Sequence, residues 1–180
     1  MRHRRARGSG QGAWLGLPDR SRGGVNNYTC NAKSYLDVNK LAVTPCKLCD
    51  SAAGEALWQD ELCRVVLVED RDYPGFCRVI LNQHVSEMTD LDAAARYGLM
   101  RAVFAAEQAL RELMQPAKIN LASFGNRVAH LHWHVIARFA DDKHFPDSIW
   151  SEARRAGAPR PIDRAALQRA LHKLLPSVAK

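Results

Sequence analysis

Apolar residues gather in four short runs in the middle of the chain, and each run has the length and composition of a β-strand. Turn residues bound the runs, which cover residues 62–68, 76–81, 118–124 and 128–139. Between the first two runs, the segment Asp70–Gly75 ends in Pro-Gly and reads as a turn. The first two runs therefore predict a hairpin-like pair, and we expect neighbouring strands to run antiparallel.

A helical period replaces the strand pattern between the second and third runs. Apolar residues recur there at spacings of three and four, which gives a helix with one apolar face. These residues are Leu99, Val103, Ala106 and Leu110. Thr89 or Asp90 can cap the N-terminus of this helix. We expect the helix to run to about Met114 and to end before Pro116.

A second helix is predicted near the C-terminus, over residues 162–175, with Asp163 as its candidate cap. The order strand-strand-helix-strand-strand favours an α+β fold with an antiparallel sheet of about five strands. We divide the chain into a basic, disordered N-terminal extension over residues 1–42, a compact domain over 43–155 and a C-terminal helical extension over 156–180.

The net charge of +7 is concentrated at the N-terminus, where residues 1–40 carry +6 of it. The rest of the chain is nearly neutral, so nucleic acid is not an expected partner of the domain. The basic tail is a real extension or upstream sequence included by a wrongly chosen start. No apolar run reaches the roughly 20 residues that cross a membrane. The N-terminus also lacks the apolar region of a secretory signal, so we expect a cytoplasmic protein.

Five cysteines without a secretory signal argue against a disulfide framework. Cys63 and Cys77 lie in apolar strand-like runs and are interpreted as small buried hydrophobic residues. Cys46 and Cys49 differ, because they form a CxxC in a polar turn. This spacing occurs in zinc sites and in redox sites. The absence of a surrounding βαβ pattern disfavours a thioredoxin-type redox site.

Three histidines occupy alternate positions in the run 128–139: His130, His132 and His134. Alternate residues of a strand point to the same side, so the three imidazoles are expected on one face. A neutral imidazole can attack phosphorus, and a neighbouring histidine can hold its tautomer and assist the leaving group. His132 is the natural nucleophile because it is flanked on both sides. The alternatives are a three-histidine metal site, for which a linear row is awkward, and a chance surface cluster.

The stretch from His130 to Ile136 resembles the HxHxHxx signature of the histidine-triad (HIT) superfamily, in which the x positions are apolar. The resemblance covers roughly residues 45–150. The segments 120–126 and 144–150 are similar to a bacterial branch labelled diadenosine-tetraphosphate hydrolase-like. This resemblance implies a HIT-like fold and makes His132 the nucleophile on an α-phosphate. His134 would contact the phosphate and support the leaving group.

The resemblance also implies two phosphate contacts on the turn before the histidines. Asn126 lies four residues before His130, where the family commonly has Gln beside the phosphate. Asn keeps the amide donor but is one methylene shorter. Arg127 stands where many members have a Ser or Thr that touches phosphate. An Arg at this position either clamps phosphate or points to solvent.

Other nucleotide contacts follow from position in the family pattern. Asn120 is a candidate polar wall of the pocket. Glu69 and Asp70 are the nearest candidates for the carboxylate that binds the ribose hydroxyls, and the alternative is that both are solvated turn residues. Trp150 either caps the nucleotide pocket or packs against the domain.

The resemblance to this family also implies a specific role for the CxxC. Members that bind structural zinc use a CxxC, a histidine after the second strand and the first histidine of the triad. These positions correspond to Cys46, Cys49, His84 and His130. The resemblance therefore implies a closed Cys2His2 zinc site that pins the N-terminal turn to the sheet. No organic cofactor is expected.

Together these patterns predict a nucleotide hydrolase or transferase that works through a nucleotidyl-histidine intermediate. Its expected substrates are dinucleoside polyphosphates or AMP conjugates. The long helix is interpreted as a packing element or a dimer surface, so a homodimer is a candidate assembly. Two alternatives are a zinc-stabilised nucleic-acid-binding module that uses the basic tail, and a nucleotide sensor that keeps the pocket but has lost turnover.

Overall fold

The computed structural model describes residues 46–158 and 160–176. The predicted extension over residues 1–42 lies outside the described residues, as do residues 43–45. Five strands form one sheet in the order β1-β2-β3-β5-β4, and every neighbouring pair is antiparallel. The strands are β1 (Glu55–Gln59), β2 (Cys63–Leu67), β3 (Cys77–Leu81), β4 (Lys118–Ser123) and β5 (His132–Arg138). The expected α+β fold with a five-stranded antiparallel sheet is confirmed.

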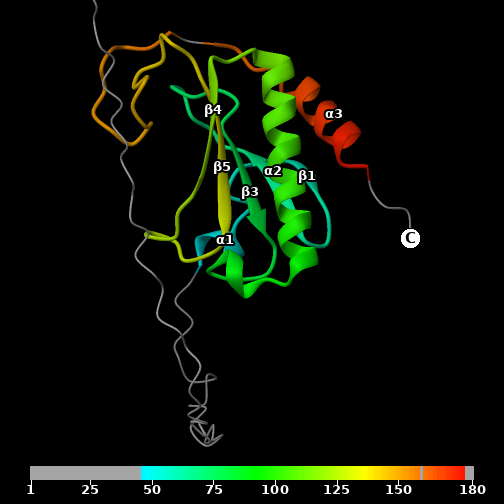
Figure 1. Ribbon diagram of the computed structural model, residues 1–180. Helices are drawn as coiled ribbons and strands as arrows, with labels where there is room; N and C mark the ends of the chain where they lie inside the picture. Colours follow the sequence, from blue (N-terminus) through cyan, green and yellow to red (C-terminus); the bar gives the residue numbers. More distant parts are fainter. Residues whose placement is uncertain (1–45, 159, 177–180) are drawn as a thin grey trace, which may run out of the picture. The chain divides into compact units, whose positions relative to one another are not determined.

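Two of the three helices in the described residues cover one face of the sheet. The long helix α2 (Ala93–Met114) packs on this face, and α3 (Arg164–Leu174) packs against α2 and β1 (Figure 1). The predicted apolar face of α2 is fully buried at Leu99, Val103, Ala106 and Leu110. The single turn α1 (Lys47–Asp50) is the third helix. No helix in the described residues is long and apolar enough to cross a membrane.

The structure corrects the predicted start of α2. Neither Thr89 nor Asp90 caps the helix, because both lie in a separate 3₁₀ turn, Met88–Asp90. Asp92 is the cap instead, and its carboxylate accepts a hydrogen bond of 2.8 Å from the backbone N–H of Ala95. The predicted cap of α3 is confirmed. Asp163 accepts from the N–H of Ala166 at 2.9 Å.

The turn between β2 and β3 is closed by a glycine that cannot be replaced easily. Gly75 has a φ of 83°, in the left-handed region that favours glycine. A Cβ at this position would lie 2.6 Å from Sδ of Met114 at the end of α2. Asp70 stabilises the start of the turn by accepting from the N–H groups of Asp72 and Tyr73 at 2.9 and 3.1 Å.

The strand predicted over residues 128–139 is shorter in the structure and starts at His132. Before it, the backbone leaves the regular ladder, and the N–H of Leu131 donates to the carbonyl of Val85 at 2.7 Å. His130 therefore precedes the strand. We expected all three histidines to belong to one strand, but only His132 and His134 lie in β5.

The two faces of the sheet have different roles. Directly opposed residues on antiparallel strands point to the same side. Ile80 lies opposite His132 and Arg78 lies opposite His134, so these side chains share the face away from α2. The other face carries the main apolar core, including Val65, Val79 and Val135. The histidines are thus held by a rigid sheet whose far side is filled by helices.

Candidate functional site

His132 is held in one tautomer by the backbone just before it. Its Nδ1 lies 2.6 Å from the carbonyl oxygen of His130. A carbonyl can only accept, so Nδ1 carries the hydrogen and Nε2 keeps its lone pair. Burial lowers the pKa of His132, and the positive charge of Arg78 lowers it further. A neutral imidazole with a free Nε2 is the form that can attack phosphorus.

His134, on the same strand as His132, is enclosed by three aromatic side chains from other parts of the fold. Its ring centroid is 5.5 Å from that of Phe76, 6.0 Å from Phe124 and 5.4 Å from Trp150. Burial, together with the charges of His132 and Arg78, lowers the pKa of His134 to about 4. The ring is neutral near pH 7. Its Nδ1 is buried and makes no hydrogen bond within the described residues.

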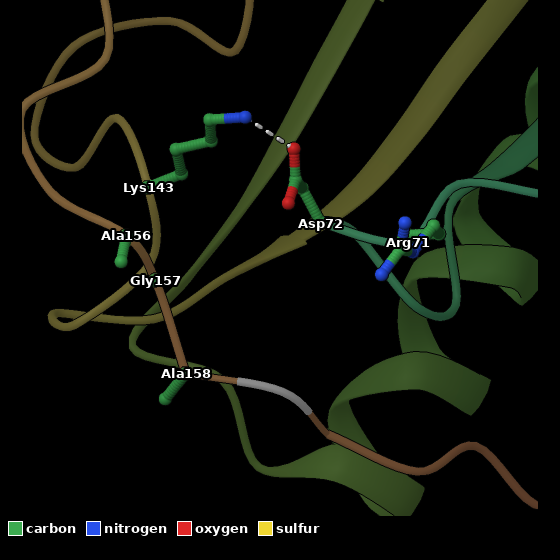
Figure 2. Close-up of a pocket in the computed structure, with 6 residues that line it drawn as sticks. All are labelled: Arg71, Asp72, Lys143, Ala156, Gly157 and Ala158. Carbon is green, nitrogen blue, oxygen red and sulfur yellow. Dashed lines mark hydrogen bonds and ion pairs between the residues drawn. The ribbon is translucent and has the colours of Figure 1, made fainter.

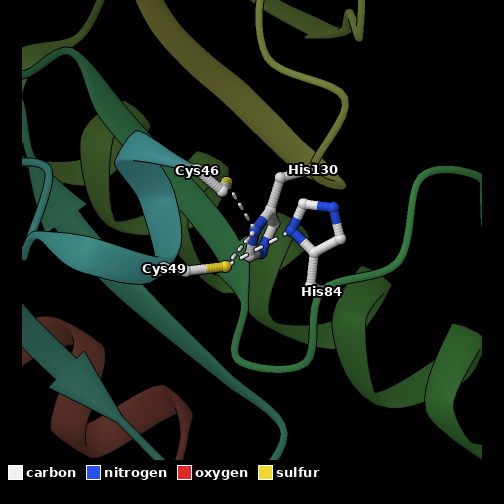
Figure 3. A group of neighbouring side chains, drawn as sticks. All are labelled: Cys46, Cys49, His84 and His130. Atoms are coloured by element: carbon white, nitrogen blue, oxygen red, sulfur yellow. Dashed lines mark hydrogen bonds between the residues drawn. The ribbon is translucent and has the colours of Figure 1, made fainter. Parts of the chain in front are cut away.

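The four residues predicted as metal ligands converge at one point (Figure 3). Their ligand atoms all lie within 4.8 Å of one another. Nδ1 of His130 is 3.4 Å from Sγ of Cys46 and 3.3 Å from Sγ of Cys49, and Nδ1 of His84 is 3.3 Å from Sγ of Cys49. Two thiolates and two imidazoles at these separations fit a tetrahedral structural zinc site.

The tautomer of His130 supports the same interpretation. Its Nε2 donates to the carbonyl of Leu81 at 2.7 Å, so Nδ1 presents a lone pair to the two sulfurs. This is the second-sphere bond that orients metal-binding histidines in many proteins. The CxxC itself lies at α1, where Cys46 caps the helix, rather than in the plain turn expected from the sequence. Cys63 and Cys77 are buried as predicted, and burial raises the pKa of each thiol to about 12.

Asn120 and Trp150 line a shared groove beside the edge strand β4. The groove has a volume of about 700 Å³, and Ala122 and Phe124 also line it. Trp150 is half-exposed and contacts the rings of both Phe124 and His134. The side-chain oxygen of Asn120 accepts from Arg138 at 2.6 Å, and the NH2 group of Asn120 has no hydrogen-bond partner among the described residues. The structure thus brings these two candidates to one side of His134.

The remaining nucleotide-binding candidates do not converge on the histidines through any described contact. Asn126 and Arg127 lie in an exposed bend after β4, and Glu69 is exposed after β2. None of these three side chains makes a hydrogen bond or ion pair within residues 46–158 and 160–176. Asp70, the alternative to Glu69, uses its carboxylate in the turn described above.

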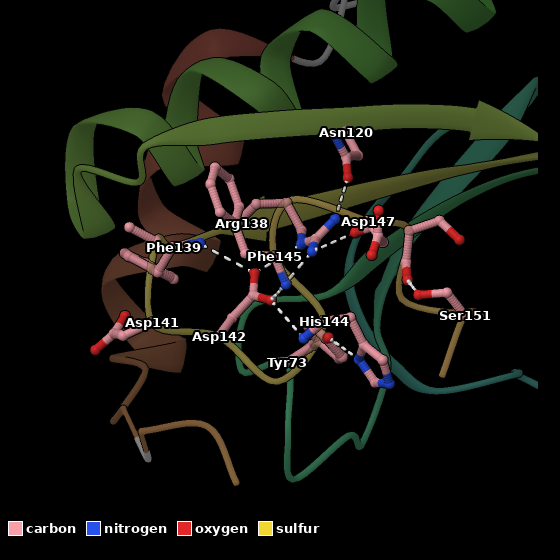
Figure 4. Close-up of polar contacts among 12 residues, drawn as sticks. Tyr73, Asn120, Arg138, Phe139, Asp141, Asp142, His144, Phe145, Asp147 and Ser151 are labelled. Carbon is pink, nitrogen blue, oxygen red and sulfur yellow. Dashed lines mark hydrogen bonds and ion pairs between the residues drawn. The ribbon is translucent and has the colours of Figure 1, made fainter. Parts of the chain in front are cut away.

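A buried polar cluster at the far end of β5 was not predicted (Figure 4). Arg138 is 1% exposed and makes two hydrogen bonds to Asp142, at 2.7 and 3.0 Å. It also donates to the carbonyl of Asp147 at 2.8 Å. Burial alone would raise the pKa of Asp142, but hydrogen bonds from Arg138 and from three backbone N–H groups lower it to about 2. This cluster ties the loop that carries Trp150 to the end of strand β5.

Arg78 is a second residue that sequence reasoning missed. It lies on β3 beside the histidines, although a charged residue within the apolar run 76–81 was a visible signal. A separate cavity of about 380 Å³ contains none of the predicted site residues (Figure 2). Arg71, Asp72 and Lys143 line it, and Nζ of Lys143 lies 2.7 Å from Asp72. The histidines predicted from the sequence to be catalytic lie elsewhere, on β5, and do not line this cavity.

Comparisons with known proteins agree with the fold described above. A model of the HIT domain family matches residues 51–141, about half of the 180-residue chain. A histidine triad protein from Bradyrhizobium japonicum has 26% identity and a TM-score of 0.52, over 69% of this chain and 92% of that protein. A histidine triad protein from Marinobacter aquaeolei VT8 has 26% identity and a TM-score of 0.56, over 71% and 93%. No curated protein matches the chain.

Proposed function

Since the chain belongs to the HIT domain family, we propose that it is a nucleotide hydrolase or transferase with His132 as nucleophile. The observation that carries this proposal is the hydrogen bond from Nδ1 of His132 to the carbonyl of His130, which leaves Nε2 free. Enzymatic turnover distinguishes this function from a nucleotide sensor with the same pocket. The alternative of a nucleic-acid-binding module depends on the basic N-terminal tail, which lies outside the described residues.

The proposed reaction has two steps. Nε2 of His132 forms a bond to the α-phosphorus while the bond from phosphorus to the leaving oxygen or nitrogen breaks. Water or another acceptor then attacks the phosphorus, the nitrogen–phosphorus bond breaks, and the imidazole is restored. The proton released by the acceptor passes to the leaving group or to solvent. His134 lies 4.9 Å from His132 between ring centroids and would contact the phosphate.

The proposed substrates are dinucleoside polyphosphates or AMP conjugates such as phosphoramidates. The groove lined by Asn120 and Trp150 has the size of a small-molecule site and adjoins the aromatic enclosure of His134. We assign the nucleoside to the end of this groove formed by Phe124 and Trp150, whose rings contact His134. Glu69 is retained as the candidate for the ribose hydroxyls, and Asn126 and Arg127 as phosphate contacts that would form when a ligand orders their exposed bend.

We also propose that Cys46, Cys49, His84 and His130 hold a structural zinc ion. All four positions are filled by protein ligands, so the ion would stabilise the fold and would not supply an open site for water. The two histidines that would touch substrate, His132 and His134, are not among the four.

The test is turnover of a panel of dinucleoside polyphosphates and AMP-amine conjugates, with the products separated and identified. His132→Ala should lower the rate by at least about 100-fold, because the nucleophile is removed. His172→Ala, at an exposed position of α3, serves as the matched control and should leave the rate unchanged. Mass spectrometry of the quenched native enzyme should find a nucleotidyl group on His132. Full activity of the His132→Ala protein would contradict the proposal.

A further inference from the structure

Arg78 places a cation on the same face as the proposed nucleophile. It lies on β3 directly opposite His134, and Ile80, two residues later, lies opposite His132. Residues two apart on a strand share a face, so Arg78 and both histidines point to the same side. The guanidinium carbon lies 5.5 Å from the centre of the Phe76 ring, which also contacts His134.

The polar groups of Arg78 have no hydrogen-bond partner in the part of the chain that the structure describes. Its Nε is buried, and within the described residues Arg78 makes no hydrogen bond and no ion pair within 4 Å. Asp70 is near enough to favour the charged form, but burial is the larger effect and lowers the pKa of Arg78. Arg138, by contrast, is fully bonded to Asp142, Asn120 and a backbone carbonyl.

A second orphan atom lies beside this cation. Nδ1 of His134 is also buried and has no hydrogen-bond partner among residues 46–158 and 160–176. Buried polar atoms in proteins are nearly always bonded, so two unsatisfied groups on adjacent strands indicate a place for a polar ligand. The two groups are a guanidinium, which can donate, and a neutral imidazole, which can donate or accept. Both suit the oxygen atoms of a phosphate.

We propose that Arg78 binds a non-bridging oxygen of the substrate phosphate that contacts His134. This inference rests on the proposed function and deepens it, because it makes the charge of the phosphate a requirement for binding. His134 is neutral near pH 7, so it supplies no net charge to a phosphate. Arginine keeps its charge at all physiological pH values and forms strong, geometrically defined bonds to phosphate oxygens. Arg78 would therefore select phosphorylated nucleosides over uncharged ones.

The experiment compares the binding of AMP and of adenosine to the full-length protein by calorimetry. Arg78→Gln should weaken AMP binding by about 10-fold to 100-fold, the range of a hydrogen bond to a charged group, and leave adenosine binding unchanged. Arg78→Lys keeps the charge but loses the fork-shaped geometry, so its AMP affinity should lie in between. Arg71→Gln, an exposed arginine at the separate cavity, is the matched control and should bind AMP normally.

Three outcomes would overturn the proposal. The first is an Arg78→Gln protein that binds AMP as tightly as the native one. The second is an equal loss of AMP and adenosine binding, which would indicate a structural role. The third is a native protein that binds AMP no more tightly than adenosine. If Arg78→Gln does not fold, as judged by circular dichroism, a loss of AMP binding alone in Arg78→Lys decides the question.

Failure of this proposal can be distinguished from failure of the proposed function. AMP is the expected product, so its binding is an equilibrium measurement that needs no turnover. A His132→Ala protein that retains full activity would refute the nucleophile and leave the Arg78 measurement intact. Normal AMP binding by Arg78→Gln would refute the role of Arg78 and leave the nucleophile intact.

Discussion

His134 combines deep burial with an unpaired ring nitrogen, and this combination makes its protonation costly. Three aromatic rings and His132 surround it, and its residual exposure is 7%. A charged imidazolium in this enclosure would lose its hydration and lie next to the guanidinium of Arg78. The folded protein therefore keeps His134 neutral well below the pH at which a free histidine takes up a proton.

This environment predicts a loss of stability in mild acid. The unfolded chain protonates His134 near its ordinary pKa of 6.5, whereas the folded chain does so only near 4. Between these values the unfolded state binds more protons, so stability falls as the pH falls through this window. The loss from this residue is on the order of 3 kcal/mol. Urea unfolding of the native protein at pH 7 and pH 4 measures it.

The matched variant for this measurement is His134→Asn, which cannot titrate. It should lose less stability than the native protein between the same two pH values. Any release of metal by acid affects both proteins, so it cancels in the difference. An equal acid-induced loss in the two proteins would contradict the assignment of a low pKa to His134.

At the residue scale, the sequence revealed the histidines because three polar residues at alternate positions of an apolar run are rare. The sequence pattern gave no structural reason for His130 to differ from His132 and His134, because strand alternation alone placed all three histidines on one face. The difference arises from the backbone at Leu131, which leaves the ladder and is bonded to Val85. The charge of Arg78 within an apolar run was visible, but its position opposite His134 depends on a strand pairing across 56 positions of sequence that no local pattern encodes.

Among the elements, α1 is too short to be stable alone. It has four residues, and an isolated helix of this length does not form in water. Leu48 anchors it to Val66 and Ile80, and Arg64 donates to the carbonyl of Leu48. A zinc ion bound by Cys46, which precedes α1, and by Cys49 within it would join this turn to the sheet through His130.

This arrangement predicts metal content and a dependence of stability on it. The purified protein should contain one zinc ion per chain, and Cys49→Ala should remove it and lower the free energy of unfolding by several kcal/mol. Cys77→Ala is the control, since this buried cysteine lies outside the cluster and its variant should keep the metal. Atomic emission for metal content and urea unfolding for stability provide the two measurements. Normal zinc content in Cys49→Ala would rule the site out.

The elements that were predicted best are those with a long, regular period. Helix α2 repeats its buried apolar positions from Leu99 to Leu110, which is about three turns, so its existence followed from the sequence. Its cap did not, because Thr89, Asp90 and Asp92 are all good capping residues. Strand β1 was not predicted as a segment. It is a five-residue edge strand with an irregular register between Ala56 and Trp58, which breaks the alternation that identifies a strand.

For the whole molecule, we propose a homodimer formed through β4 and the adjoining face of α2. Among the described residues, strand β4 is at the end of the sheet order, and no strand pairs with its outer edge. Tyr97 and Phe104 lie seven residues apart on α2, which places them on one helix face, and they are 73% and 55% exposed. Exposed aromatic residues and an unpaired strand edge are both typical of surfaces that a second copy covers.

This proposal predicts that Phe104→Glu is a monomer at concentrations where the native protein is a dimer. A charge at this position would have to be buried in the interface without a partner. Gln168→Glu, on the exposed side of α3, introduces the same charge elsewhere and should remain dimeric. Sedimentation equilibrium gives the mass of each species. A native protein that sediments as a monomer would contradict the proposal.

The backbone of His130 links two sites that share no side chain. Its imidazole faces Cys46 and Cys49, while its carbonyl fixes the ring of His132. A chelator that extracted zinc would free the imidazole, and the carbonyl would lose the anchor that sets its direction. The nucleophile would then sample both tautomers. In an inhibition assay, chelators would therefore inhibit the protein as they inhibit a metalloenzyme, even though the zinc ion would not contact the substrate phosphate.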